Sequence, residues 1–524
     1  MHVCLITRRS RFGVFAVALT FCVLLLVYWR QPGGVLENTN FHIPLGKSSD
    51  GDTTKDGAKT GSPPDFGTTS RFRPVSFPKD KKATDDELCA SFPSHLLQSV
   101  QPVLKVGHYD VMKKDLLTAQ LDGPSRCFSP DELLVFSDLD DNFGKHEVVD
   151  VLATLPEQYR NTADNTKWQN YERMRELRAE GLLDIDHEAT KNISGWSLDK
   201  FKFLAIVEQA WERKPGRDWY VFYETDTYVF WDNMFRFLGN LDPETPMYMG
   251  SPSPGREDPV RLKHEKSKVT WFANGGPGYV ISRAAMRKLL DREVGPNGRY
   301  ATGSLTERWY KIARDDCCGD SVVGWALWNN DVPVSGYWPL FNPHSLHGVP
   351  YYDSQWCQPV LTLHKSRPDA VTDLWRWEHQ VRTPHRPLVY RDLYEFGLSD
   401  VPAQKENWDN GAWASFKPQS RVNSLGMCEK ECEVAKKCVQ YRWKEGAETG
   451  CLLMREVTLG VAKEPQEVEG KKEDGVKEQE NHERDGETKV RYTSGWMLDR
   501  IGRWKKERPC SKVDWVPPSI KRIF

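Results

Sequence analysis

Two carboxylates stand one residue apart at the point where a buried strand is expected to end. The run Trp219–Tyr223 is aromatic and β-branched, which is typical of a strand buried in a sheet. Glu224, Thr225 and Asp226 follow it, and residues two apart on an extended chain point to the same side. Two hard oxygen ligands at the carboxyl end of a strand suit Mg²⁺ or Mn²⁺ that holds a diphosphate. The alternative interpretation is a strand end with surface acids.

A glycine-rich stretch and two lysines supply groups that could meet such a diphosphate. Gly275 and Gly276, in FANGGPGYVIS, allow the backbone to approach a ligand closely. Lys200 and Lys202 precede the apolar part of GWSLDKFKFLAIVEQAWERK, whose spacing predicts a helix. Either ammonium could reach a diphosphate as a point charge. The alternative is that at least one of them points into water.

A second group of acids precedes another apolar helix. Asp315, Asp316 and Asp320 lie close together in ARDDCCGDSVVGWALW, and Gly319 permits a tight turn there. A carboxylate placed there could act as a general base that takes the proton of an attacking hydroxyl. The alternative is that Asp320 caps the helix, and the two roles are compatible.

The order of these motifs resembles the fringe and core 1 β1,3-galactosyltransferase group, glycosyltransferase family 31, and particularly its fungal fringe-like members. The resemblance spans roughly Leu133 to Glu378. In that family an acidic triplet precedes Thr or Asn, Tyr and Val, so Asp226 falls on the metal-binding aspartate. Glu224 and Thr225 occupy the two preceding positions, where the family usually has aspartates. The resemblance implies that these two residues contact the bound donor.

The same resemblance implies a catalytic base and a second donor-site acid. In fringe-like enzymes the catalytic aspartate lies four residues before a glycine, and Asp320 stands at that distance from Gly324. Asp315 and Asp316 do not, so they are the runners-up. The family also has a donor-site acid near Asp138, which follows a short predicted strand. An ordinary turn or helix cap is the alternative there.

Two histidines are candidates for completing a metal site begun by Asp226, because an imidazole suits such ions. His344, in LFNPHS, lies at the distance from Asp320 that fringe-type sequences show. His364, in VLTLHK, resembles the histidine of core 1 synthases and many fungal relatives. We prefer His364 because it ends a predicted strand. A structural role is the alternative for each histidine.

The N-terminal region predicts a membrane anchor and a compartment. Phe12–Trp29 is almost wholly apolar and would span roughly 27 Å as a helix. Arg8, Arg9 and Arg11 precede it, which favours a cytoplasmic N-terminus and a type II signal anchor over a cleaved signal peptide. We therefore expect a Golgi or ER membrane protein whose catalytic part is lumenal. The predicted segments are a tail (1–11), the anchor (12–29) and a flexible stem (30–85).

Ten cysteines follow the anchor, which permits five disulfides in an oxidising compartment. We expect Cys89 to pair with Cys127, and one of Cys317 and Cys318 to pair with Cys510. The spacing C-x₃-C-x₅-C-x₁₂-C from residue 428 to 451 is similar to a PAN/Apple-like module. The predicted C-terminal segments are this module (415–460), a charged disordered insert (461–490) and a tail (491–524).

These observations predict an α/β protein with a GT-A-type, Rossmann-like glycosyltransferase domain at 86–400. The resemblance implies an inverting hexosyltransferase, similar to N-acetylgalactosaminide β1,3-galactosyltransferases. It would move galactose or N-acetylglucosamine from a UDP-sugar to a glycoprotein or glycolipid, with Mn²⁺ or Mg²⁺ as cofactor. The net charge of −2 gives no sign of a nucleic-acid partner. The alternatives are a non-catalytic relative that acts as a transferase chaperone, and a carbohydrate-binding membrane protein.

Overall fold

The computed structural model describes residues 83–382, 385–412, 415–418, 421–446, 449–467 and 489–522. The predicted tail and anchor, and all of the stem before residue 83, lie outside these described residues. Within the described ranges, no helix combines the length and the apolar character that crossing a membrane requires. The anchor at 12–29 therefore stays a prediction.

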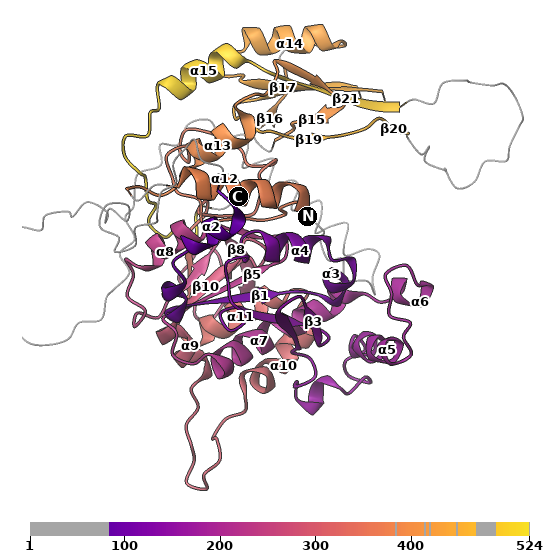
Figure 1. The fold of residues 1–524 in the computed structure, drawn as a ribbon, viewed down its shortest axis with the longest axis vertical. Helices are drawn as coiled ribbons and strands as arrows, with labels where there is room; N and C mark the ends of the chain where they lie inside the picture. Colours follow the sequence, from indigo (N-terminus) through magenta and orange to yellow (C-terminus); the bar gives the residue numbers. More distant parts are fainter. Residues whose placement is uncertain are drawn as a thin grey trace, which may run out of the picture. The chain divides into compact units, whose positions relative to one another are not determined.

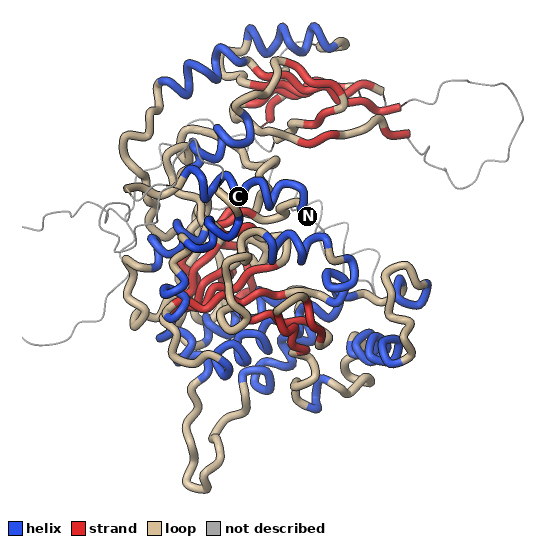
Figure 2. The backbone as a smooth tube through the Cα atoms, viewed as in Figure 1, coloured by secondary structure: helices blue, strands red, loops and turns tan. Residues whose placement is uncertain are grey.

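An eight-stranded sheet is built from strands between Val100 and Gly336 (Figures 1 and 2). Its strand order is β11-β7-β10-β5-β1-β2-β4-β3. Neighbouring strands run parallel from β5 through β1 and β2 to β4, whereas β10 is antiparallel to both β5 and β7. A mixed sheet rich in parallel pairs fits the predicted α/β class. The strands are β1 (Val100–Lys105), β2 (Leu134–Ser137), β3 (Asp141–Phe143), β4 (His146–Asp150), β5 (Trp219–Glu224), β7 (Tyr248–Gly250), β10 (Tyr279–Ser282) and β11 (Val334–Gly336).

Side chains of β5 alternate between two hydrophobic cores, one on each face of the sheet. Tyr220 and Phe222 belong to the core that α7, α9, α10 and α11 complete. Trp219, Val221 and Tyr223 belong to the core that includes α8 and part of α4. This alternation follows from the two-residue period of a strand, and it buries β5 on both faces. These helices are α4 (Asp115–Asp122), α7 (Gly195–Arg213), α8 (Trp231–Leu238), α9 (Arg283–Leu290), α10 (Leu305–Asp315) and α11 (Gly319–Asn329).

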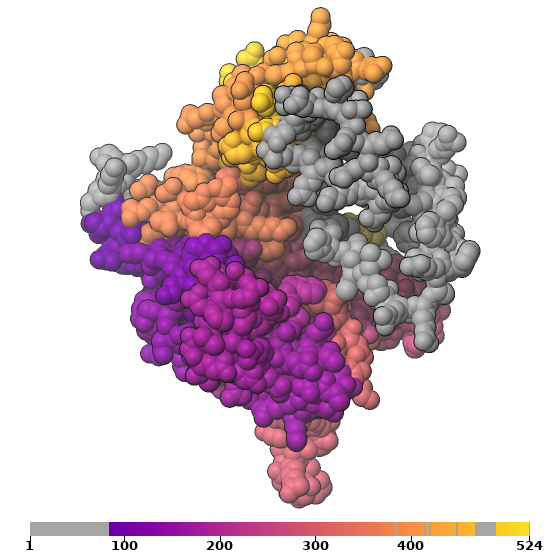
Figure 3. Space-filling model, turned by 90° about the vertical axis from the view of Figure 1, so that its right-hand side faces the viewer, coloured from indigo at the N-terminus to yellow at the C-terminus, as the bar shows by residue number. Residues whose placement is uncertain are grey.

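Smaller elements connect or cover this framework. The loop between α9 and α10 projects from the molecule in Figures 1 and 3, and its Tyr300 is exposed. Residues 157–191 contain η2, α5 and α6. These and the other elements are α2 (Asp85–Ala90), η1 (Ser94–Gln98), α3 (His108–Lys113), η2 (Glu157–Tyr159), α5 (Trp168–Ala179), α6 (Glu188–Lys191), the β8 (Pro252–Glu257) and β9 (Val269–Ala273) pair, α12 (Pro368–Val381) and α13 (Tyr390–Leu398).

The C-terminal cysteine-rich unit contains a six-stranded sheet, a two-stranded sheet of β15 and β19, and two helices (Figure 1). Its strands come from both sides of the segment 415–460, because β14 precedes that segment and β21 follows it. Strands β19 and β20 and the first two residues of β21 lie in the insert (461–490) that the sequence predicts as disordered. That prediction is therefore wrong for 461–467 and 489–490; residues 468–488 are not described. The elements are β14 (Gln404–Glu406), β15 (Trp408–Asp409), β16 (Ser415–Phe416), α14 (Leu425–Val434), β17 (Gln440–Glu445), β18 (Gly450–Met454), β19 (Val461–Ala462), β20 (Gln466–Glu467), β21 (Lys489–Trp496) and α15 (Leu498–Lys506).

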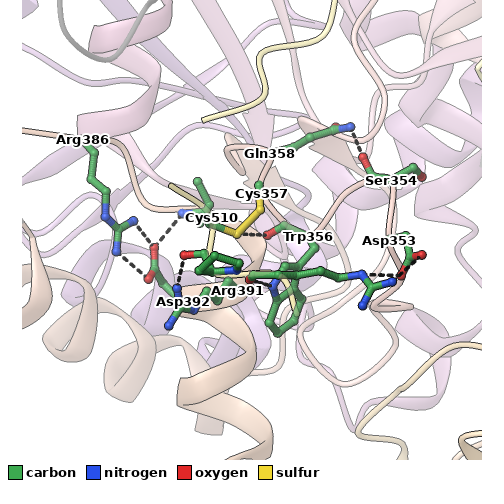
Figure 4. The surroundings of a disulfide bond; sticks show 12 residues. Asp353, Ser354, Trp356, Cys357, Gln358, Arg386, Arg391, Asp392 and Cys510 are labelled. Carbon is green, nitrogen blue, oxygen red and sulfur yellow. Dashed lines mark hydrogen bonds and ion pairs between the residues drawn. A yellow bond between two sulfur atoms is a disulfide. The ribbon is translucent and has the colours of Figure 1, made fainter. Parts of the chain in front are cut away.

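Five disulfides connect the ten cysteines of the described residues. Cys89 bonds to Cys127, which confirms that predicted pair. The predicted bond between Cys510 and the Cys317-Cys318 pair is wrong, because Cys317 bonds to Cys318 and Cys510 bonds to Cys357. After α15 the chain returns beside Trp356, where the Cα atoms of Cys357 and Cys510 are 5.2 Å apart (Figure 4). The remaining bonds are Cys428–Cys451 and Cys432–Cys438, both inside the C-terminal unit.

Candidate active site

A cavity of about 950 Å³ opens at the carboxyl ends of three parallel strands. Lys105 ends β1, Asp138 follows β2, and Glu224 ends β5, and all three line the cavity. Parallel strands in one sheet bring their carboxyl ends to the same edge, where α/β proteins commonly bind ligands. Lys105, Asp138 and Glu224, which are far apart in the sequence, therefore lie at the same edge of the sheet. Thr225, Asp226, Lys202, Gly276, Asp320 and His364 line the same cavity.

Three of these side chains could hold a metal ion together. Each of Glu224, Asp226 and His364 offers a ligand atom, and these atoms all lie within 4.8 Å of one another. The distance between Asp226 Oδ2 and His364 Nε2 is 3.4 Å. A site of two carboxylates and one imidazole fits Mn²⁺ or Mg²⁺ by its donor atoms.

A small second sheet brings Asp226 and His364 together although they are far apart in sequence. Its strands are β6 (Tyr228–Val229), β12 (Phe341–Asn342) and β13 (Thr362–Leu363), with β13 between the other two. The antiparallel pairing of β13 with β6 places the residue after β13 beside the turn before β6. The amide of Ser366 also donates to the carbonyl of Asp226, at 2.8 Å.

Burial and the neighbouring carboxylates both disfavour ionisation of Asp226. Burial raises the pKa of Asp226; the nearby His364 lowers it, and the carboxylates of Glu224 and Asp110 raise it again, with a net upward shift. Deprotonating acids that are held close together costs free energy, because their negative charges repel each other. A divalent cation bound among them would remove that cost.

The two glycines of the predicted donor site pack against the two proposed functional side chains. A β-carbon at Gly276 would lie 2.2 Å from Cε1 of His364, so only glycine leaves room for that ring. The amide of Gly275 donates to Asp320 Oδ2 at 2.8 Å. Thr227 Oγ1 donates to the carbonyl of Gly276 at 2.6 Å and fixes this stretch against the acidic turn.

Asp320 lies in the first turn of α11 and faces the cavity. Its other carboxylate oxygen accepts from the amide of Ser321 at 2.9 Å. The N-cap residue of α11 is Cys318, so the alternative that Asp320 itself is the N-cap is wrong. Burial raises the pKa of Asp320 to about 6, although the two backbone hydrogen bonds oppose that shift. A carboxylate with this pKa is a suitable proton acceptor near neutral pH.

The two runner-up acids have other partners. Asp315 is exposed and pairs with the neighbouring Arg314 at 2.7 Å. Asp316 pairs with Arg256 at 2.8 Å and accepts from the hydroxyl of Ser321. Neither lines the cavity. The geometry therefore favours Asp320 among the three.

Charged groups that the sequence reasoning missed connect the metal group to Asp138. Lys105 Nζ lies 2.6 Å from Asp199 Oδ1 and 3.2 Å from Glu224 Oε1. Burial alone would lower the pKa of Lys105, but the Asp199 and Glu224 carboxylates raise it well above its ordinary value. Lys202 pairs with Asp199 at 3.1 Å and lies 3.7 Å from Asp138. Lys105 gave no signal in the sequence, because it ends a strand without any motif around it.

Neither Lys200 nor Lys202 points into water. Lys202 is almost fully buried, and Lys200 donates to the carbonyl of Asp316 at 2.9 Å, so the expectation that at least one of them would point into water is wrong.

Asp138 is buried, and it accepts from the amide of His108 at 2.6 Å and from its ring at 3.1 Å. Burial opposes ionisation of Asp138, yet Lys202 and His108 hold its pKa well below the ordinary value. Asp138 and Lys202 therefore form an ionised pair in the cavity wall.

His344 is placed less favourably than His364. Among the described residues, His344 is not part of the Glu224–Asp226–His364 group that could hold a metal ion. Its carbonyl accepts from the amide of His364 at 3.2 Å, and burial lowers its pKa to about 4.

Two exposed aromatic side chains, Tyr109 and Trp196, line the cavity. Trp196 begins α7 and is 69% exposed, the largest exposed fraction among the aromatic residues that the structure describes as exposed. It lines the cavity together with Cys317 and Cys318. The sequence does not single out Trp196, because exposure is not visible in a local pattern.

Comparisons with known proteins cover the middle of the chain. Residues 136–330 match the family model described as Fringe-like. A fringe glycosyltransferase of Drosophila melanogaster is 31% identical over 82 residues, which make up 15% of this chain and 20% of the fly protein. The beta-1,3-N-acetylglucosaminyltransferase lunatic fringe of Bos taurus is 33% identical over 80 residues, 14% of this chain and 21% of the bovine protein. The chain thus spans about a fifth of the length of these curated relatives. The fringe-like region carries Glu224, Asp226 and Asp320, and it supports a glycosyltransferase at the level of the domain.

Proposed function

We propose that this protein is an inverting glycosyltransferase that moves a hexose from a UDP-sugar to a glycan hydroxyl. The observation that carries the proposal is that Asp226, His364 and Asp320 line one cavity at the carboxyl edge of a fringe-like sheet. A metal group and a separate carboxylate of pKa about 6 are the two functions that this reaction needs.

Each residue has a distinct role in this proposal. Asp226 and His364, with Glu224 beside them, would hold Mn²⁺ or Mg²⁺. When bound, the ion would neutralise charge on the diphosphate of the departing UDP. Asp320 takes the proton of the acceptor hydroxyl as its oxygen attacks the anomeric carbon. Gly275 holds Asp320 in place through its amide.

The charged side chains in the cavity wall, Lys105, Lys202, Asp138 and Glu224, would orient the donor. Lys105 keeps Glu224 beside Asp226, and Lys202 keeps Asp138 ionised at the other end of the wall. Thr225 lines the cavity between the two acids of the turn. Asp138, Lys202, Thr225, Gly275 and Gly276 are thus proposed as donor-binding or donor-positioning residues. The identity of the sugar, galactose or N-acetylglucosamine, and the β1,3 linkage rest on the family resemblance.

The proposed compartment is the lumen of the Golgi or ER. The five disulfides of the described residues suit an oxidising environment. The proposed topology, a type II anchor at 12–29, rests on the sequence alone.

A donor screen tests the proposal. The purified full chain is incubated with Mn²⁺, a mixture of glycan acceptors and each UDP-sugar in turn, and released UDP is measured. We expect acceptor-stimulated release with UDP-galactose or UDP-N-acetylglucosamine. A chain that binds no UDP and releases none with any donor would favour the non-catalytic alternatives.

A further inference from the structure

A second cavity, of about 760 Å³, lies where the C-terminal cysteine-rich unit meets the loop before β13. It shares no residue with the candidate active site. Two acidic side chains line it, Asp353 and Glu507. Six cationic side chains face them, namely Lys436, Lys437, Arg455, Arg500, Arg503 and Arg508. The chain as a whole has a net charge of −2, so this positive excess is local.

Both acids of the cavity are engaged by a single arginine. Arg508 Nε lies 2.9 Å from Asp353 Oδ1, and Arg508 Nη1 lies 3.3 Å from Glu507 Oε2. Among the described residues, Lys436, Lys437 and Arg503 have no carboxylate within ion-pair distance. All three are exposed. The cavity therefore presents three cations that are available to an anionic ligand.

The framework that carries these cations is fixed by covalent and hydrogen bonds. The Cys432–Cys438 disulfide encloses Lys436 and Lys437 in a short loop. Arg500 Nη1 donates to the carbonyls of Cys432 and Cys438, each at 2.8 Å, and so closes the same loop. A site that is ordered before binding loses less conformational entropy when it binds.

The opposite wall is fixed by aromatic contact and by a disulfide. Trp504 packs against Trp356 with ring centroids 4.4 Å apart, and Trp356 Nε1 donates to the carbonyl of Arg508 at 3.0 Å. The Cys357–Cys510 disulfide lies beside Trp356 (Figure 4). The half-buried indole of Trp504 adds an apolar surface to the cavity.

We propose that this cavity binds an acidic oligosaccharide, a glycan segment that carries carboxylate or sulfate groups. Its volume lies in the usual range for ligand sites, roughly 300–1,000 Å³. Arginine binds planar and tetrahedral oxyanions through paired N–H donors, and an indole face accommodates a sugar ring. The choice of a glycan over other polyanions rests on the proposed function, because a glycan-transferring chain meets glycans. The site would hold a part of the glycan remote from the reacting sugar, or a separate acidic glycan.

Calorimetric titration of the full chain tests this proposal. The probes are a heparin-derived tetrasaccharide, a tetramer of galacturonic acid and neutral cellotetraose. We expect both acidic probes, but not the neutral one, to bind with an affinity that falls as salt rises. The triple variant Lys436→Glu, Lys437→Glu and Arg503→Glu should weaken binding of the acidic probes by about tenfold or more. If the charge reversals prevent folding, the corresponding triple Ala variant replaces them, and it should show a smaller loss of affinity for the acidic probes.

A matched control has three other exposed lysines reversed, Lys263→Glu, Lys266→Glu and Lys288→Glu, none of which lines the cavity. Equal weakening by the control would show non-specific attraction and overturn the proposal. So would equal binding of cellotetraose, or binding of phosphatidylserine vesicles with no binding of either acidic probe. UDP binding in the same samples reports on the active site separately, so failure of the proposed function would be visible as a distinct result.

Discussion

The β-carbon that any residue other than glycine would place at position 276 falls 2.2 Å from Cε1 of His364. His364 is the imidazole of the candidate metal group, and its side chain is only 17% exposed. A β-carbon at position 276 would therefore force the ring to shift from its place beside Asp226. This relationship ties the glycine-rich stretch of the sequence to the metal group, through steric exclusion and without a hydrogen bond.

Gly276→Ala should consequently weaken metal binding. The added methyl group displaces the His364 ring from Asp226, and loss of such a supporting contact typically costs about 10–100-fold in metal affinity. The measurement is the Mn²⁺ concentration that gives half-maximal UDP binding. Gly502→Ala is the matched control, because a β-carbon there meets no atom within 4 Å. An unchanged Mn²⁺ requirement in Gly276→Ala would remove His364 from the metal group.

Asp226→Asn should abolish metal-dependent UDP binding while the chain still folds. The change keeps the size of the side chain and removes the charge that attracts the cation. UDP affinity of the wild type and of the variant, each with and without EDTA, gives the comparison. Metal-independent binding of UDP by the wild type would contradict the proposed role of the ion.

Trp196→Ala should weaken use of the acceptor and leave the donor unaffected. An exposed indole at the cavity wall offers a face to a sugar ring, and aromatic contacts of this kind contribute about 0.5–1.5 kcal/mol, or roughly 2–10-fold in KM. The measurement is KM for the acceptor against KM for the UDP-sugar. Tyr300→Ala, an exposed aromatic on the loop between α9 and α10, is the control. A change in donor KM alone would place Trp196 on the donor side.

Sequence reasoning predicted the parts of the site that lie in local motifs. The acidic turn after β5 and Asp320 lie in short stretches with a clear pattern, and both line the cavity. The Cys89–Cys127 bond, also predicted, joins residues 38 apart. Contacts between distant segments were harder to foresee. The partnership of Lys105 with Glu224 depends on the parallel pairing of β1 with β5, which no local pattern specifies.

The error over Cys510 has a similar cause. An even number of cysteines indicates that they can all pair, but it does not show that two adjacent cysteines bond to each other. The route of the chain after α15 decided the partner, because it brings Cys510 to Cys357 and away from Cys318. The boundaries of the C-terminal unit were missed for the same reason, since β21 pairs with β17 across a long insertion.

Glu378→Gln should remove a pH-dependent loss of stability. Burial raises the pKa of Glu378 to about 8, and Asp232 adds to this shift. Between the ordinary value of about 4.5 and 8, the folded protein keeps this proton whereas the unfolded chain releases it, so stability falls as pH rises, by about 1.4 kcal/mol per pH unit. The clearest window is pH 6.5–8, because the shifted histidines and Asp320 titrate below it.

The thermal midpoint of unfolding at pH 6.5 and at pH 8 measures this effect. The wild type should lose stability across the window, and Glu378→Gln should lose less. The hydroxyl of Tyr228 donates to Glu378 at 2.6 Å, and the Gln carbonyl can accept the same bond. Glu172→Gln, an exposed position on α5, is the control. Parallel pH profiles for wild type and Glu378→Gln would show that Glu378 is ionised in the folded protein.

Asp320→Asn should reduce kcat for sugar transfer by about 10²–10⁴-fold, the usual cost of losing a general base. UDP affinity should change little, because the proposed metal group does not include Asp320. The pH profile adds a second readout. Since the carboxylate must be ionised to accept a proton, wild-type kcat should fall as pH drops through about 6, and the residual activity of the variant should lack that limb. Asp315→Asn, at an exposed position outside the cavity, should behave as wild type. Near-normal transfer by Asp320→Asn together with an inactive Asp316→Asn would assign the base to Asp316, despite its ion pair with Arg256.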